Sequence, residues 1–254
     1  MGWRVVSRQS LDKVTFMATG DEPTSTPSPD PAEVPRLYAP LPDRTEDTST
    51  TYERCLRKLI DLLGAERPLV TTDTRRSRRR WQHEARRVIA QAMRRRPVRE
   101  EWFEPLVRAA ILEPDPSFNR QLVEPALAAF GRRRVQLALL EHLRTGTNPE
   151  RAGAARAWYW TQVPLTYLAG SRSPTPESKA EYNAFADLRR EWHETALRMF
   201  VANEDLDVRR CILPGLDLGT QQYPEDLHET VAEAIRIART HPDEYLRHRV
   251  EHQI

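Results

Sequence analysis

Residues 205–210, DLDVRR, carry the pattern that decides the fold, because variants of it recur in the second half of the chain. Residues 148–152 read NPERA, and residues 241–247 read HPDEYLR. Each time, an acidic or amide residue, often with proline, opens a predicted helix that carries an arginine in its first turns. Such recurrence indicates stacked helix pairs, since each pair buries its apolar face only against the next pair.

The rest of the body shows apolar residues at helical spacing, and no segment alternates apolar and polar residues for long, as a half-buried strand would. Proline and glycine fall mostly at predicted helix ends, although Pro125 lies inside one helix, where we expect a kink. The fold class is therefore all-α. The expected helices cover residues 52–63, 74–95, 98–112, 117–130, 132–144, 149–163 and 177–203, then a shorter one from Asp205, 224–239, and a last one from about Pro242.

The pattern resembles the HEAT and armadillo class of helical repeats over residues 52–254. Pro125 within one helix, then Gly131 and a second amphipathic helix, is similar to the step from helix A to helix B of a HEAT unit. Residues 205–209 are similar to its Asp-Pro-x-Val-Arg opening of helix B, with Leu206 where proline is usual. The resemblance implies a right-handed α-solenoid of antiparallel helix pairs, in which Asp205 and Arg209 belong to a buried ladder between repeats.

The first 51 residues differ in composition from the body. From residue 19 onward they are dense in proline, threonine, serine and aspartate, a composition that buries too little surface to offset chain entropy. We expect a disordered arm at 1–51, followed by one repeat domain at 52–254. Because residues 17–22 look like an ordinary bacterial start, it stays open whether residues 1–16 are translated.

The composition favours a cytoplasmic protein with no membrane segment. Residues 2–16 contain charged residues and no continuous apolar core, unlike a signal peptide, and no stretch approaches the roughly 20 apolar residues of a membrane span. Cys55 and Cys211 lie far apart without a metal-type spacing, so we interpret them as buried thiols. The net charge is only +2 at pH 7, and nearly all of the 39 basic residues are arginines.

A stripe of arginines on the predicted helix 74–95 is the best candidate for a binding surface. At 100° per residue, Arg76, Arg80, Arg87 and Arg94 share the face opposite the apolar one, together with His83. Such a face suits electrostatic binding along a nucleic-acid backbone. The alternative is a solvated face, or one paired with the acidic residues Glu100, Glu101 and Glu104 that follow it.

Two further patterns concern metals and aromatic stacking. The dipeptide His-Glu occurs at positions 83, 193 and 228, which is similar to the metal-binding pairs of the HEAT-like deoxyhypusine hydroxylase, although that family uses four pairs. We expect no metal and no cofactor, and we attribute His248 and His252 to a favourable helix C-terminus. Residues 158–160, WYW, diverge by 100° each, so we expect two of them in the core and one at its rim.

No phosphate loop, nucleophile elbow or paired catalytic carboxylate is recognisable, so the sequence favours a non-enzymatic protein. Three hypotheses follow. The first is a helical-repeat scaffold for protein–protein interaction with an unknown protein partner. The second is a nucleic-acid binder or HEAT-like DNA repair protein that uses the basic helix 74–96. The third is a metal-dependent HEAT-like hydroxylase.

Overall fold

The computed structural model describes residues 46–254 except 71–73, 169 and 171, and within them the prediction of an all-α fold is confirmed. The described residues contain no strand beyond an isolated bridge between Tyr167 and Pro174. None of their helices is long and apolar enough to cross a membrane. The helices are α1 (Glu46–Leu62), α2 (Arg75–Arg95), α3 (Phe103–Leu112), α4 (Arg120–Phe130), α5 (Arg132–Thr145), α6 (Asn148–Trp158), α7 (Pro176–Asn183), α8 (Ala186–Ala202), α9 (Leu206–Ile212), α10 (His228–Thr240) and α11 (Glu244–Glu251).

The expected arm at 1–51 falls mostly outside the described residues. Residues 1–45 are not described, whereas residues 46–51 belong to α1. The helical body therefore begins before the predicted boundary at residue 52.

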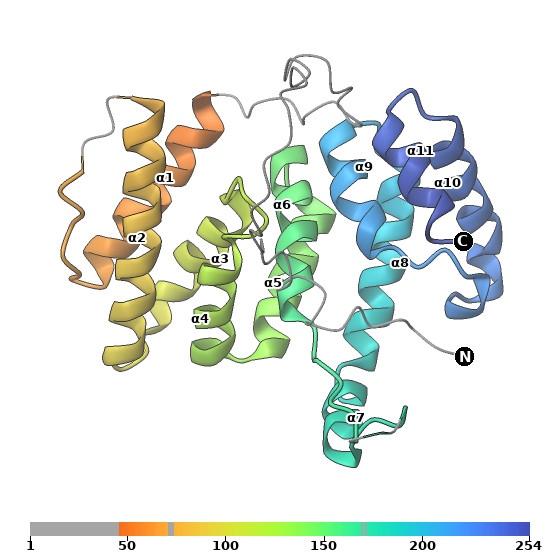
Figure 1. Cartoon of the computed structure of the whole chain (residues 1–254), viewed down its shortest axis with the longest axis horizontal. Coiled ribbons are helices and arrows are strands. Elements are labelled where there is room, and N and C mark those ends of the chain that lie inside the picture. Colours follow the sequence, from red (N-terminus) through yellow and green to blue (C-terminus); the bar gives the residue numbers. More distant parts are fainter. Residues whose placement is uncertain (1–45, 71–73, 169, 171) are drawn as a thin grey trace, which may run out of the picture.

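Apart from α7, which projects beyond α8, the described helices stand side by side in two rows (Figure 1). In one row α3 packs against α1 and α6, α6 against α9, and α9 against α11. In the other row α4 packs against α2 and α5, and α8 packs against α5 and α10. Pairs formed by α1–α2, α3–α4, α5–α6, α8–α9 and α10–α11 join the two rows, so the apolar faces meet in one continuous seam.

The order of the rows changes at Gly131. In the first two pairs the earlier helix lies in the row of α6, whereas in the last three pairs the later helix does. Helix α4 packs mainly on α3 and α5 mainly on α6, so the expected step from 117–130 to 132–144 within one pair is not the pairing found. Gly131 ends α4 and precedes α5 with φ of 81°, a conformation that favours glycine. Helix α4 itself continues through Pro125.

The expected single helix 177–203 is wrong, because the chain breaks into α7 and α8 (Figure 1). Phe185, with φ −116° and ψ 18°, interrupts the helical backbone. Arg133 of α5 holds this break. Its guanidinium donates to the Ala184 carbonyl at 2.9 Å and binds the Asp187 carboxylate at 2.7 Å, in the first turn of α8.

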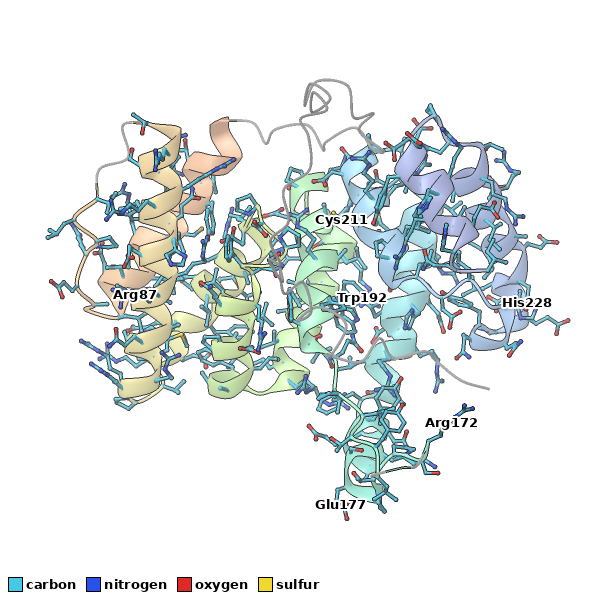
Figure 2. All side chains as sticks on the ribbon, in the orientation of Figure 1. Arg87, Arg172, Glu177, Trp192, Cys211 and His228 are labelled. Carbon is cyan, nitrogen blue, oxygen red and sulfur yellow. The ribbon has the colours of Figure 1, made fainter. Side chains whose placement is uncertain are left out.

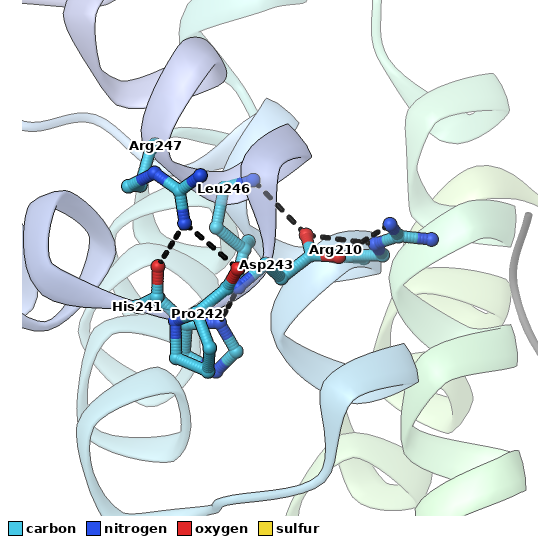
Figure 3. Close-up of polar contacts among 6 residues, drawn as sticks. All are labelled: Arg210, His241, Pro242, Asp243, Leu246 and Arg247. Atoms are coloured by element: carbon cyan, nitrogen blue, oxygen red, sulfur yellow. Dashed lines mark hydrogen bonds and ion pairs between the residues drawn. The ribbon is translucent and has the colours of Figure 1, made fainter. Parts of the chain in front are cut away.

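The recurring sequence pattern lies at the start of α6, α9 and α11, which are consecutive helices of one row. The N-caps are Thr147, Asp205 and Asp243, and an arginine follows each cap by four residues. All three arginines donate to backbone carbonyls in the last turn of the preceding helix or just beyond it, where carbonyls lack helical partners. The donors and acceptors are Arg151 to Arg144 at 3.3 Å, Arg209 to Phe200 at 3.3 Å, and Arg247 to His241 at 2.6 Å (Figure 3).

A glycine allows α3 and α6, which are neighbours in this row, to touch. A Cβ at Gly153 of α6 would lie 1.9 Å from the carbonyl oxygen of Ile111 in α3. Only a residue without a side chain fits that distance, so α3 and α6 are in backbone contact at this point.

Candidate binding surface on helix α2

Helix α2 ends its row and is anchored on one face only. Thr74 caps it, since the Ser77 amide donates to Thr74 Oγ1 at 3.1 Å and the Thr74 amide donates back to Ser77 Oγ at 2.9 Å. Trp81, Ala85 and Ile89 are buried, and the helix packs against α1 and α4. The opposite face is open at this end of the molecule, where Figure 2 labels Arg87.

The four predicted stripe residues, Arg76, Arg80, Arg87 and Arg94, are all exposed. Arg87 binds Glu84 of the same helix at 2.9 Å. Among the described residues, no carboxylate lies within ion-pair distance of the other three. Helix α2 contains nine arginines and one glutamate, a formal charge of +8 within a chain of net charge +2. The positive charge of the protein is therefore concentrated on this helix.

The acidic residues that follow α2 bind elsewhere. Glu100 pairs with Arg134 of α5, with Arg134 Nη1 2.8 Å from Glu100 Oε2, and that hydrogen bond lowers the pKa of Glu100. Glu101 pairs with Arg99 at 2.9 Å. Glu100 and Glu101 therefore do not neutralise the arginine stripe in this structure, because their described partners lie outside α2.

A shallow pocket of about 270 Å³ lies between α2 and the loop that precedes it. Leu69 in its lining is 96% exposed, the most solvent-accessible of the large hydrophobic residues in the described part. Two of the arginines in the lining are engaged, Arg67 with Asp61 at 2.7 Å and Arg87 with Glu84. The aliphatic lining comes from Leu69, Val70 and Val88, and the basic lining comes from Arg67, Arg80 and Arg87.

A buried polar network fixes α2 to its neighbours. Arg86 points from the apolar side of α2, and its Nη1 lies 2.5 Å from Glu113 Oε2, at the end of α3. The Tyr52 hydroxyl of α1 also donates to Glu113, and the Asp115 amide donates to its other oxygen at 3.1 Å. The Arg86 guanidinium lies 4.5 Å from the centre of the Phe118 ring. The side chains of Tyr52, Arg86 and Glu113 are at most 3% exposed, so this network is structural and does not belong to the binding surface.

Burial raises the pKa of Glu113, and Arg86 and Tyr52 oppose that rise by favouring the charged carboxylate. Burial also raises the pKa of Tyr52 well above its ordinary value. Sequence reasoning missed this network. The available signal was Arg86 itself, which at 100° per residue falls beside Ile89 at the edge of the apolar face and outside the arginine stripe.

The predicted structural residues Asp205 and Arg209 both act within one helix pair. Asp205 caps α9 by accepting from the Val208 amide at 2.9 Å, and Arg209 bonds to α8 as described above. The role of Asp205 and Arg209 in a ladder between repeats stays a prediction. The next residue, Arg210, makes a buried ion pair with the neighbouring helix pair, since its Nη2 lies 2.5 Å from Asp243 Oδ2 at the start of α11 (Figure 3). Both side chains are less than 10% exposed.

A second polar contact links α6 to α9. Arg156 Nη1 lies 3.1 Å from Cys211 Sγ and 3.6 Å from the Asp207 carboxylate. Burial raises the pKa of the Cys211 thiol to about 12 although Arg156 opposes the rise. The described Cys55 is also buried and free, and burial raises its pKa. The thiols therefore stay protonated and serve packing.

The three His-Glu pairs lie on α2, α8 and α10, and the structure does not gather them into one site. Figure 2 labels His228 far from the α2 end. No group of three or more histidine, cysteine, aspartate or glutamate side chains in the described ranges is arranged to hold a metal ion.

The aromatic run at 158–160 is divided between core and surface. Trp158 is buried and stacks on Trp192 of α8, with ring centres 4.0 Å apart and planes 3° from parallel. Trp160 packs partly against the core and donates its Nε1–H to the Pro116 carbonyl at 3.1 Å, while Tyr159 is 61% exposed. The run therefore offers no common stacking platform.

Comparison of the chain with protein-family models, with characterised proteins and with solved structures found no match. The all-α architecture is shown, but the comparisons identify no family or repeat, so the HEAT-like assignment stays a prediction.

Proposed function

We propose that this protein is a non-enzymatic scaffold, built as a right-handed solenoid of HEAT-like antiparallel helix pairs, that binds a protein partner. Two observations support the solenoid. The helices stack in two rows from α1–α2 to α10–α11, and α6, α9 and α11 share both the opening phrase and the arginine bond to the preceding helix end. Stacked pairs present a long surface that suits an extended partner.

The arginine face of α2 carries the functional part of the proposal. These arginines contribute little to the fold, because Arg76, Arg80 and Arg94 meet no carboxylate of the described residues. Arg76 even lies in the first turn, where the helix macrodipole makes a cation unfavourable by roughly 0.3–1 kcal/mol. An exposed cation that gains nothing from its own helix is suited to binding a negatively charged partner.

Site-specific photo-crosslinking in the cells that express the protein tests this proposal. A photoreactive amino acid replaces Arg79, an exposed residue of α2, and in a matched control it replaces Arg190, an exposed residue of α8. We expect protein adducts from position 79 in excess of those from position 190. Equal or absent protein adducts at the two positions would contradict a protein-binding role for α2.

Nucleic-acid binding is the second candidate function, and the engagement of Glu100 and Glu101 with other arginines favours it. Neither of these carboxylates is paired with Arg76, Arg80 or Arg94, which are exposed to a phosphate backbone. An Arg80→Glu, Arg87→Glu variant tests it against duplex DNA and single-stranded RNA. If the candidate is correct, affinity falls steeply with added salt, and the double charge reversal abolishes binding. Salt-insensitive binding, or binding that the variant retains, would exclude it.

A further inference from the structure

We propose that the pocket beside α2 binds an acidic segment of a partner protein by seating one of its aliphatic side chains between Leu69, Val70 and Val88. This inference rests on the proposed scaffold function and names the chemistry of its partner. It depends on three features of the described surface: an exposed aliphatic lining, arginines on both sides of it, and a size that fits a side chain.

The aliphatic lining is unusual for a surface at the end of a charged helix. Leu69 is 96% exposed, and Val70 and Val88 beside it are half-buried. An aliphatic side chain placed here removes apolar surface from water on both partners.

The arginines extend from the pocket in both directions along α2. Arg80 is part of the lining, Arg76 lies one turn before it, and Arg94 lies further along the same helix. At ~1.5 Å per residue, Arg76 and Arg94 are about 27 Å apart. An extended segment rising ~3.3 Å per residue covers that distance with about eight residues. Its carboxylates meet the arginines while one uncharged side chain occupies the pocket.

The size and the chemistry of the pocket disfavour other occupants. Its volume of about 270 Å³ is below the ~300–1,000 Å³ typical of small-molecule sites, so it fits a side chain better than a whole ligand. Its described lining has no aromatic side chain on which a nucleic-acid base could stack. Glu66 and Glu84 in the lining repel a phosphate and a peptide carboxylate alike, so the side chain that occupies the pocket is the uncharged one of the segment.

Fluorescence anisotropy with the full chain tests the inference. The probe is a labelled peptide of glutamates with one central leucine, and the control peptide has glycine in place of that leucine. We expect the leucine peptide to bind at least tenfold more tightly, which is about 1.4 kcal/mol. Leu69→Ser removes this difference, Arg80→Glu weakens both peptides, and Arg190→Glu leaves both unchanged. Circular dichroism of each variant confirms that the helices are retained.

Several results of the same experiment would overturn the inference. Equal affinity for the two peptides, or an unchanged difference in Leu69→Ser, overturns the pocket as the binding site. Displacement of the peptide by a thymidine oligonucleotide of matched charge, with tighter binding of the oligonucleotide, overturns the inference in favour of nucleic acid. Binding of neither peptide also overturns it. The scaffold proposal is judged separately, since protein adducts at position 79 depend on neither peptide.

Discussion

Removing Arg86 from the buried network should destabilise the protein more than removing any exposed arginine of the same helix. In Arg86→Met the Glu113 carboxylate keeps its bonds to Tyr52 and to the Asp115 amide but loses its ion partner in a site that is only 1% exposed. Leaving one charge of a buried pair uncompensated costs about 3–5 kcal/mol. A domain has about 5–15 kcal/mol of stability in total, so the loss is a large fraction of it.

The double variant Arg86→Met, Glu113→Leu separates the charge effect from packing. Because it removes both charges, it should lose less stability than the sum of the two single variants. Glu113→Leu alone should destabilise, since it buries the Arg86 guanidinium with the Tyr52 hydroxyl, at 3.2 Å, as its remaining hydrogen-bond partner. The difference between the double variant and the sum is the coupling energy of the pair.

Urea unfolding followed by circular dichroism measures these free energies. Arg80→Met, an exposed change on the same helix, is the matched control and should stay within about 0.5 kcal/mol of the unmodified protein. If Arg86→Met were no less stable than Arg80→Met, or if the two single effects simply added in the double variant, the network would not anchor α2 as described.

Three other predictions concern the contacts between helices. Gly153→Ala should lower the unfolding midpoint sharply, because the new Cβ would meet the Ile111 carbonyl 1.9 Å away, and Gly215→Ala is a control that adds a Cβ with nothing within 4 Å. The Arg133 hydrogen bond lowers the pKa of Asp187 to about 2. In Arg133→Gln, an NMR titration should give Asp187 a pKa of about 4, and a value still at about 2 would refute the contact. Since the folded pKa is the lower one, the stabilising contribution of Asp187 is present above pH 4 and is lost as pH falls from about 4 to 2. Burial raises the pKa of the Cys211 thiol to about 12. In a Cys55→Ser background, alkylation of Cys211 at pH 8 should therefore be at least a hundredfold slower in the folded chain than in the unfolded chain. Comparable rates would show an accessible thiolate.

Local patterns predicted the helices well because the signals that form them are local. Thr74, Asp205 and Gly131 mark helix ends through their own hydrogen bonds or backbone conformation, and the amphipathic spacing of α2 put Arg76 and Arg80 on the exposed face. These features depend on residues within one or two turns, so the sequence alone contains them.

Features that depend on distant residues were not predictable in the same way. At the break before α8 the Ala184 carbonyl accepts from Arg133, which lies 51 positions earlier, and local periodicity does not indicate this contact. The reversed order of the rows at Gly131 follows from which faces of α4 and α5 find partners, and helical periodicity does not specify the partner.

The contacts of the arginines in α9 were also only partly predictable from the sequence. The recurring sequence pattern located the arginine that follows each cap by four residues, but the buried ion pair between α9 and α11 uses Arg210, one position further along. Adjacent residues on a helix point 100° apart, so only the packing decides which of them meets the next pair.

Arg76, Arg80 and Arg94 meet no carboxylate among the described residues, and arginine-selective chemical modification read by mass spectrometry tests most directly whether they are free for a partner. In the isolated protein we predict fast modification of Arg76, Arg80 and Arg94 and slow modification of the buried Arg86 and Arg210. A bound partner should then slow the first group selectively. Protection of Arg76, Arg80 and Arg94 in the isolated protein, at the level of Arg86, would contradict the account.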